Sequence, residues 1–129
     1  MVDIKVVDTG APKGGPYSPG LIAGNLIFVS GQVPAGKDGK VPSSIEEQTA
    51  VTLGNLKAIL EKAGGKVANV VRCTVFMTNI AEFKRMNEAY TKFFDENGAR
   101  DRKPTRTTVE ITKLAKDGAR IEIDCIALL

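Results

Sequence analysis

Charged side chains of both signs lie near the end of the chain, on two segments in which apolar and polar residues alternate. Residues 120–124 read R-I-E-I-D, so the three charged side chains share one face of an extended strand. Residues 106–110 read R-T-T-V-E and place an arginine and a glutamate on one face in the same way. The sequence contains no histidine, which excludes histidine-based triads and most transition-metal sites. Any chemistry must come from carboxylates, arginine, lysine, tyrosine, hydroxyl groups and the backbone.

The two charged segments are predicted to form a hairpin closed by K-D-G at residues 116–118. If they pair, their charged faces lie on one side of the sheet and their apolar faces pack on the core. A register centred on the turn places Arg106 opposite Asp124. It also places Glu110 opposite Arg120. Such contacts are either ion pairs on a solvated surface, worth about 0–1 kcal/mol each, or, if the face is covered, charges held in a pocket.

Two helices are predicted between the strands. Ser44 and Glu47 form a capping box at the start of the first helix, and G-G at residues 64–65 ends it. Asn79, with Glu82 as its box partner, starts the second helix, which ends at N-G before residue 99. The apolar residues predicted to face the core are Leu53, Leu56, Ile59, Leu60 and Ala63 in the first helix and Phe83, Met86, Tyr90, Phe93 and Phe94 in the second. The second stripe fits a core better than a cofactor site.

Four further strands complete the predicted fold. They cover residues 4–7, 18–23, 26–33 and 70–78. The order β-β-β-α-β-α-β-β indicates one α+β domain over residues 1–129, with both helices on one face of a mixed six-stranded sheet. Val29 and Phe76 are expected on the uncovered face. A partly apolar bare face is typically covered by a symmetric homo-oligomer, which would also cover the face with Arg106 and Glu122.

The composition is that of a globular protein, with 43% hydrophobic and 26% charged residues in 129. The net charge of +3 is too small to indicate nucleic acid by itself. No apolar run reaches the length of a membrane span, and the N-terminus lacks the pattern of a signal or transit peptide. We therefore expect a cytoplasmic protein without a membrane partner. Cys73 and Cys125 are expected to be buried, reduced thiols.

Three residues outside the charged segments are further candidates for contact with a ligand. Tyr17 stands in a Gly- and Pro-rich loop, where it either packs over a small ligand or plugs the loop against the core. Gly31, near the end of a strand, indicates a bulge or a backbone that something approaches closely. Asn87 lies beside the apolar stripe of the second helix, from which its amide can reach the edge of a pocket.

Five segments together resemble the RidA (YjgF) family of enamine/imine deaminases over nearly the whole chain. They are G-P-Y-S at residues 15–18, S-G-Q at 30–32, N-x-x-Y-x-x-F-F at 87–94, R-T-T-V-E at 106–110 and K-D-G-A-R-I-E-I-D-C-I-A at 116–127. The resemblance implies a chorismate-mutase-like fold. It also implies a homotrimeric barrel of sheets with clefts between the subunits.

The resemblance also implies roles for individual residues. Arg106 is expected to grip a substrate carboxylate, because its planar fork matches a carboxylate, and Glu122 to orient and activate the attacking water. The substrate-binding residues implied are Tyr17, Gly31, Asn87, Arg106 and Thr108. The substrates implied are small 2-imino or 2-enamino acids released by pyridoxal-phosphate dehydratases, which are hydrolysed to 2-keto acids and ammonia. Neither a metal nor an organic cofactor is required.

The chain departs from the family pattern at several positions. Thr108 replaces a cysteine found in some members, Ala115 replaces a proline, and Asp124 replaces a glutamate. The loop of residues 99–104 is longer and more basic than usual and is expected to border the cleft and influence substrate preference. Two alternatives to a deaminase remain. One is an RNA-directed endoribonuclease or translation inhibitor, and the other is a non-catalytic ligand-binding or chaperone-like trimer with Arg106 as its anion site.

Overall fold

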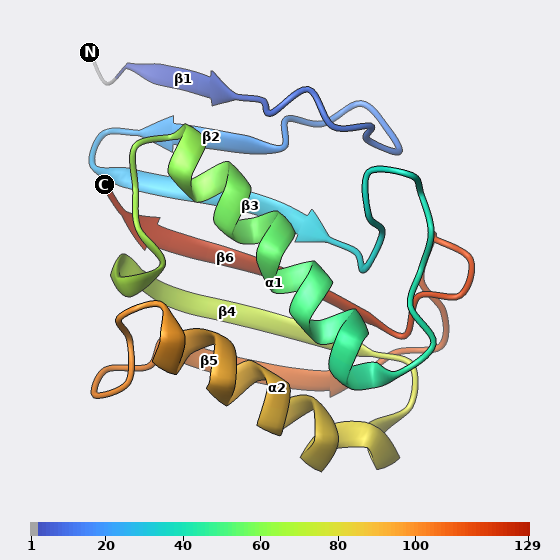
Figure 1. The fold of residues 1–129 in the computed structure, drawn as a ribbon. Helices are drawn as coiled ribbons and strands as arrows, with labels where there is room; N and C mark the ends of the chain where they lie inside the picture. Colours follow the sequence, from blue (N-terminus) through green and yellow to red (C-terminus); the bar gives the residue numbers. More distant parts are fainter. Residues whose placement is uncertain (1–2) are drawn as a thin grey trace.

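The computed structural model describes residues 3–129 and shows a mixed six-stranded sheet with two helices on one face (Figure 1). The strands are β1 (Ile4–Val7), β2 (Gly20–Ala23), β3 (Leu26–Gln32), β4 (Val70–Met77), β5 (Thr105–Glu110) and β6 (Ile121–Leu128). The helices are α1 (Ile45–Lys62) and α2 (Phe83–Glu96), with short 3-10 helices η1 (Val67–Asn69) and η2 (Ile80–Glu82). The predicted α+β class and element order are confirmed. Residues 1 and 2 of the predicted domain lie outside the described residues.

The strand order in the sheet is β1-β2-β3-β6-β4-β5, which contradicts the predicted hairpin of the last two strands. β4 lies between β5 and β6 and pairs parallel with β5 and antiparallel with β6. The reason is the crossover through α2, which returns the chain parallel to β4 at the sheet edge. The loop after β5 then carries the chain past β4, so that β6 lies between β4 and β3. Periodicity within each strand could not reveal this intervening strand.

Neither predicted cross-strand ion pair exists. Arg106 lies beside Cys73 of β4, not opposite Asp124. Asp124 accepts a hydrogen bond from the backbone N–H of Thr74 at 3.2 Å. Glu110 accepts from the backbone N–H of Ile80 at 2.9 Å. The remaining predicted partner, the Arg120 guanidinium, instead donates to the carboxylate of Glu82 at 2.9 Å and 3.2 Å.

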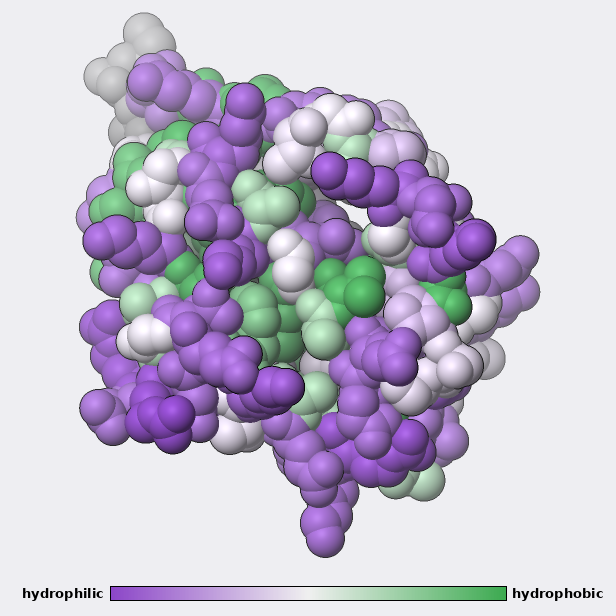
Figure 2. Space-filling model, in the orientation of Figure 1, coloured by the Kyte–Doolittle hydropathy of each residue, from purple (hydrophilic) through white to green (hydrophobic). Residues whose placement is uncertain are grey.

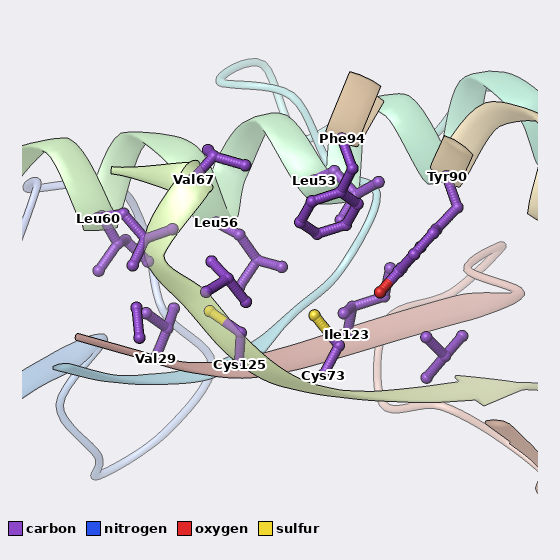
Figure 3. Packing of buried hydrophobic residues seen from close by; sticks show 14 of the residues in the cluster. Val29, Leu53, Leu56, Leu60, Val67, Cys73, Tyr90, Phe94, Ile123 and Cys125 are labelled. Atoms are coloured by element: carbon purple, nitrogen blue, oxygen red, sulfur yellow. The ribbon is translucent and has the colours of Figure 1, made fainter. Parts of the chain in front are cut away.

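Side chains that alternate along β4 and β6 divide the sheet into an inner face, which the helices cover, and an open face. Cys73 and Cys125 are directly paired on the inner face, and both are buried free thiols, as predicted. Their sulfur atoms point toward α1 and α2 in Figure 3. Burial raises the pKa of the Cys73 thiol to about 11, so it stays protonated. The largest fully buried side chains include Phe94, Ile27, Ile45, Leu53, Leu60, Met77 and Met86.

The open face carries an apolar row contributed by four strands. Its members are Val6, Leu21, Phe28 and Ile126, which are paired in register across the sheet. Phe76 lies on this face as predicted, because it pairs with Glu122. Val29 does not: it pairs with Cys125 and is buried on the inner face. Val71 of β4 is 38% exposed, where the β4–β6 register shifts between Val70 and Arg72.

The faces of β5 are the reverse of those predicted. Arg106 and Thr108 pair with the buried residues Cys73 and Val75, so they lie on the inner face. Val109 pairs with Phe76 and lies on the open face, 38% exposed. Parallel pairing with β4 sets this orientation. At an edge strand, the apolar stem of an arginine can cover core side chains while its charged end stays near solvent.

Helix ends follow the local sequence signals, with two differences. Of the predicted box between Ser44 and Glu47, the structure shows only the bond from the Glu47 N–H to the Ser44 hydroxyl. The Ser44 hydroxyl accepts from the N–H of Glu47 at 3.1 Å and caps α1, and Gly64 adopts a positive φ of 86° after it. Asn79 caps η2 by accepting from the N–H of Ala81, and α2 begins only after this short turn. The predicted box between Asn79 and Glu82 is therefore absent, since the Glu82 carboxylate accepts from Arg120.

The outer side of the two helices is largely hydrophilic, with apolar side chains gathered toward the middle of this view (Figure 2). The arrangement follows the amphipathic pattern of helices packed on a sheet. Within residues 3–129, no helix is both long enough and apolar enough to cross a membrane.

Candidate functional site

Arg106 is held on the inner face of β5 by residues of α2. Its Nη2 donates to Oδ1 of Asn87 at 2.8 Å. Its guanidinium carbon lies 4.7 Å from the ring centroid of Tyr90 and 5.6 Å from that of Phe83. Residues spaced by four and three positions share one face of a helix. Phe83, Asn87 and Tyr90 are spaced in this way, so one stripe of α2 meets the arginine.

Arg106 has no carboxylate partner among residues 3–129. Arg85 and Arg120 each form ion pairs within 4 Å, with Glu46 and Glu82, and Arg100 pairs with Asp95. A partly buried cation without a counterion is unfavourable unless something else neutralises it. This arrangement is therefore well suited to bind an anion.

Thr108 lies two residues after Arg106 on the same face, and its hydroxyl oxygen is buried without a hydrogen-bond partner. An unpaired buried hydroxyl is costly, by about 1–3 kcal/mol. The Arg106 guanidinium and the Thr108 hydroxyl therefore share one strand face, and both have unused hydrogen-bonding capacity. We call Asn87, Arg106 and Thr108 the arginine half-site.

Glu122 lies on the open face of β6, next to Gly31 of β3. A Cβ atom built on Gly31 would lie 2.8 Å from Cδ of Glu122 and still closer to one of its oxygens. The register between β3 and β6 shifts between Val29 and Gln32, which is the bulge predicted at Gly31. Only glycine allows the backbone to approach the carboxylate this closely.

Burial raises the pKa of the Glu122 carboxyl, and the neighbouring negative charge of Asp124 raises it further. Both residues project from the open face of β6, two positions apart. A carboxyl with a raised pKa exchanges protons closer to neutral pH than an ordinary glutamate does.

Tyr17 belongs to a loop that is attached beside Gly31. The N–H of Ser30 donates to the carbonyl of Pro19 at 2.9 Å, and the Ser30 hydroxyl donates to the carbonyl of Ser18 at 2.6 Å. The Tyr17 side chain is 44% exposed, and its hydroxyl accepts from the N–H of Gly14 at 3.2 Å. The tyrosine therefore does not plug the loop against the core. We call Tyr17, Gly31 and Glu122 the carboxylate half-site.

A single chain does not bring the two half-sites together. Arg106 is in register with Cys73, whereas Glu122 is in register with Phe76, three residues further along β4. Two strand spacings separate β5 from β6, about 9.6 Å, and three residues add about 10 Å along the strand. The two side chains also leave opposite faces of the sheet. The prediction that the charged faces lie on one side is therefore wrong.

The basic loop of residues 99–104 is tied to its own surroundings. Lys103 Nζ donates to Asp95 at 2.6 Å and Arg100 lies 3.2 Å from the same carboxylate. These contacts hold the pKa of Asp95 below its usual value, the Lys103 hydrogen bond contributing most. Arg102 Nη2 donates to the carbonyl of Ala68 at 2.9 Å. The expected influence of the loop of residues 99–104 on substrate preference stays a prediction.

Two contacts of Arg106 were missed by sequence reasoning. Phe83 and Tyr90 were assigned only to the core stripe of α2, but both rings lie against the guanidinium. The available signal was their spacing of seven residues, with Asn87 between them on the same helix face.

Known proteins share the sequence pattern and the fold of this chain. A family model described as endoribonuclease L-PSP matches residues 9–129. The 2-iminobutanoate/2-iminopropanoate deaminase of Escherichia coli strain K12 is 43% identical over 115 residues, covering 88% of each chain. A RutC family protein of Pyrococcus abyssi is 43% identical over 120 residues, covering 91% of this chain and 90% of that protein.

Solved structures show the same similarity. The crystal structure of E. coli TdcF with bound serine superposes with a TM-score of 0.90 at 38% identity, covering 97% of this chain and 98% of that chain. The YjgF gene product of E. coli superposes with a TM-score of 0.89 at 41% identity, covering 96% of this chain and 98% of that chain. Both superpositions cover at least 96% of this chain.

Proposed function

The chain belongs to the endoribonuclease L-PSP family, which contains the YjgF/RidA proteins, and we propose that it is a deaminase that hydrolyses small 2-imino acids. The substrates are 2-iminobutanoate and 2-iminopropanoate, with their enamine tautomers, released by pyridoxal-phosphate dehydratases. The products are the 2-keto acid and ammonia. The relatives named as deaminases support this reaction class.

The observation that carries the proposal is the Arg106 guanidinium without a carboxylate partner among residues 3–129. Every substrate of this class has a carboxylate beside the imine carbon. A bidentate contact with arginine holds that carboxylate in one plane and so orients the imine carbon. The unpaired hydroxyl of Thr108 lies on the same strand face and is a further donor for the bound molecule.

Glu122 supplies the proton transfers in this proposal. Its carboxylate takes a proton from a water molecule as the water oxygen bonds to the imine carbon, and it passes this proton to the imine nitrogen, which gives a carbinolamine. Glu122 then takes the proton of the carbinolamine hydroxyl and passes it to the amino nitrogen. The carbon–oxygen double bond forms as the carbon–nitrogen bond breaks, ammonia leaves, and Glu122 is again a carboxylate. The raised pKa of Glu122 suits a group that both accepts and donates a proton.

The two half-sites require a second copy of the chain to act on one substrate, because they leave opposite faces of one sheet. We propose a homotrimer in which the β5 edge of one copy meets the open face of its neighbour. The apolar row with Phe28 and Ile126 on the open face supports such an assembly, since an exposed apolar surface favours burial. Each cleft would then combine Arg106 of one copy with Glu122 of another.

A coupled assay tests the proposal. A threonine or serine dehydratase generates the imine, and the loss of enamine absorbance and the appearance of keto acid are followed with and without this protein. Acceleration that disappears in Arg106→Ala is the expected result. The absence of acceleration with both amino acids, in a protein that folds and assembles, would overturn the proposal.

The name of the family model makes RNA cleavage a second candidate. The same preparation is incubated with a labelled single-stranded RNA. Cleavage that persists in Glu122→Gln and weakens steeply with salt would indicate a separate RNA-directed activity. If 2-oxobutanoate binds while neither imine nor RNA is turned over, the protein is a non-catalytic ligand-binding member of the family.

A further inference from the structure

Among the arginines of residues 3–129, Arg106 is the one whose guanidinium lies over aromatic rings. Arg72 and Arg102 also lack a carboxylate partner, but they donate to the Thr107 hydroxyl and the Ala68 carbonyl. Arg85 and Arg120 lie against carboxylates, with closest distances of 2.7 Å and 2.9 Å. Arg106 instead lies against an amide oxygen and two aromatic rings. All three of these partners are uncharged, so they hold the guanidinium without neutralising it. We call Phe83, Asn87 and Tyr90 the neutral cradle.

The geometry of α2 explains how the neutral cradle surrounds the cation. Phe83 and Tyr90 are seven residues apart, which places them about 10.5 Å apart along the helix axis on the same face. The guanidinium carbon lies 5.6 Å from one ring centroid and 4.7 Å from the other, so it fills the space between the two rings. Asn87, one turn after Phe83, accepts a hydrogen bond from Nη2 and sets the rotation of the planar group.

The two rings differ in burial, and this difference separates their contributions. Tyr90 is 4% exposed, and in Figure 3 its side chain runs from α2 toward the sheet beside Cys73. Phe83 is 38% exposed at the start of the helix. Phe83 does not belong to the buried core cluster, and its ring lies against the Arg106 guanidinium.

We infer that Phe83 and Tyr90 are positioning residues that preorganise the Arg106 guanidinium, with Asn87, to receive the substrate carboxylate. This inference rests on the proposed function of Arg106. A free arginine side chain samples many rotamers, and fixing it on binding weakens affinity. Aromatic rings carry no net charge. Their faces attract the cation but leave its remaining N–H groups and its charge available to a ligand. A carboxylate at Asn87 would compete with the substrate for the same charge.

The first test replaces the exposed ring. Phe83→Leu keeps an apolar side chain and removes the aromatic face, and Phe83→Tyr keeps the face. The loss of a cation–π contact at a partly exposed position corresponds to about a two- to fivefold change in affinity. We expect Phe83→Leu to raise KM for the imine, and Kd for 2-oxobutanoate measured by calorimetry, by about that factor, with kcat within about twofold. Phe83→Tyr should restore both constants.

A merely structural role for Phe83 predicts a different pattern. It would lower the folded fraction, and therefore the apparent kcat, while KM and Kd stayed the same. Ile80→Ala is the matched control, because Ile80 is 43% exposed in the preceding turn and its backbone N–H, not its side chain, makes the recorded contact. An equal rise in Kd in this control would overturn the inference, as would an unchanged Kd in Phe83→Leu.

The second test introduces a charge without changing shape. Asn87→Asp places a carboxylate against Arg106 at the position of the amide. We expect Kd for 2-oxobutanoate to rise at least about tenfold, more than in Phe83→Leu. An unchanged Kd would show that neutrality of the cradle is irrelevant and would overturn the inference. Tyr90→Leu, compared with the conservative Tyr90→Phe, repeats the ring test at the buried position, with thermal unfolding measured in parallel.

A spectroscopic readout keeps the inference separate from the proposed function. Ring currents of Phe83 and Tyr90 should shift the Nε–Hε resonance of Arg106 in ¹⁵N-labelled protein, and the signal is assigned by its loss in Arg106→Lys. Phe83→Leu should move this resonance toward the position of an exposed arginine, and Phe83→Tyr should not. If the wild-type protein fails to hydrolyse imines but shows these shifts, the proposed function fails while the preorganisation of Arg106 stands. If imines are hydrolysed and the resonance does not respond to Phe83→Leu, the inference fails alone.

Discussion

The arginine half-site and the carboxylate half-site hold their charged groups in different ways. Arg106 is positioned by side chains of α2, which contact its guanidinium through an amide and two rings. Glu122 is positioned by the sheet itself, through the bulge at Gly31 and its pairing with Phe76. One charge therefore depends on helix packing and the other on strand register.

The electrostatic environments of the two half-sites also differ. The partners of Arg106 leave its positive charge uncompensated, which favours binding of an anion. The surroundings of Glu122 disfavour its negative charge, because burial and Asp124 both raise its pKa. The first arrangement suits binding and the second suits proton transfer. Under the proposed function, we therefore expect substrate affinity and catalytic rate to change independently of one another.

Replacing the Glu122 carboxylate with an amide should have the largest effect on activity. Glu122→Gln removes the group that accepts and donates protons, and we expect kcat to fall by about 10²–10⁴ with a small change in KM. The dehydratase-coupled assay measures both constants. Because Gln keeps the shape beside Gly31, thermal unfolding should be nearly unchanged. An equal loss in KM and kcat would show that Glu122 binds substrate instead.

Removing the guanidinium should affect mainly binding. Arg106→Ala loses charge-assisted hydrogen bonds to the carboxylate, each worth about 1.5–3 kcal/mol, so kcat/KM should fall by about 10²–10³. The fold and assembly should survive, since the side chain forms no ion pair with a carboxylate in residues 3–129. Sedimentation and unfolding measurements check this point. Unfolding of this variant, with normal turnover by the folded fraction, would contradict the anion-binding role.

Mixing the two variants tests whether the half-sites of different copies cooperate. Arg106→Ala and Glu122→Gln chains, unfolded together at equal amounts and refolded, should form mixed trimers. If each cleft joins the two half-sites from different copies, about a quarter of the clefts have both residues intact. Activity should then rise to about a quarter of the wild-type value, although each variant alone is nearly inactive. Separately refolded proteins mixed afterwards are the control, and no recovery would show that one chain supplies both residues.

Removing the negative charge of Asp124 should have the smallest effect on activity, and it tests the electrostatic difference between the half-sites. Asp124→Asn deletes the negative charge that helps to raise the pKa of Glu122, while burial continues to raise it. Glu122 must be ionised to accept a proton from water, so activity falls as the pH drops through its pKa. We expect this acidic limb of the kcat/KM profile to move to lower pH, with kcat at neutral pH within a few-fold of wild type. A shift to higher pH would contradict this assignment.

Many features of this protein were determined by the sequence alone, because they depend on local periodicity and on helix and turn signals. The two helices, the cap at Ser44, the glycine bulge at Gly31 and the buried thiols of Cys73 and Cys125 were all predicted and observed. The family resemblance pointed to Arg106 and Glu122, and the family assignment is confirmed. Their catalytic roles stay proposals.

The position of β4 between β5 and β6 was decided only by the tertiary structure. Alternation along a strand shows which residues share a face but not which face meets the core or which strand lies alongside. For this reason the predicted pair of Arg106 with Asp124 was wrong, and the contacts of Arg106 with Phe83 and Tyr90 were not foreseen. Residues distant in sequence meet because the crossover through α2 places β5 at the sheet edge. That placement puts Arg106 and Glu122 on opposite faces of the sheet within one chain.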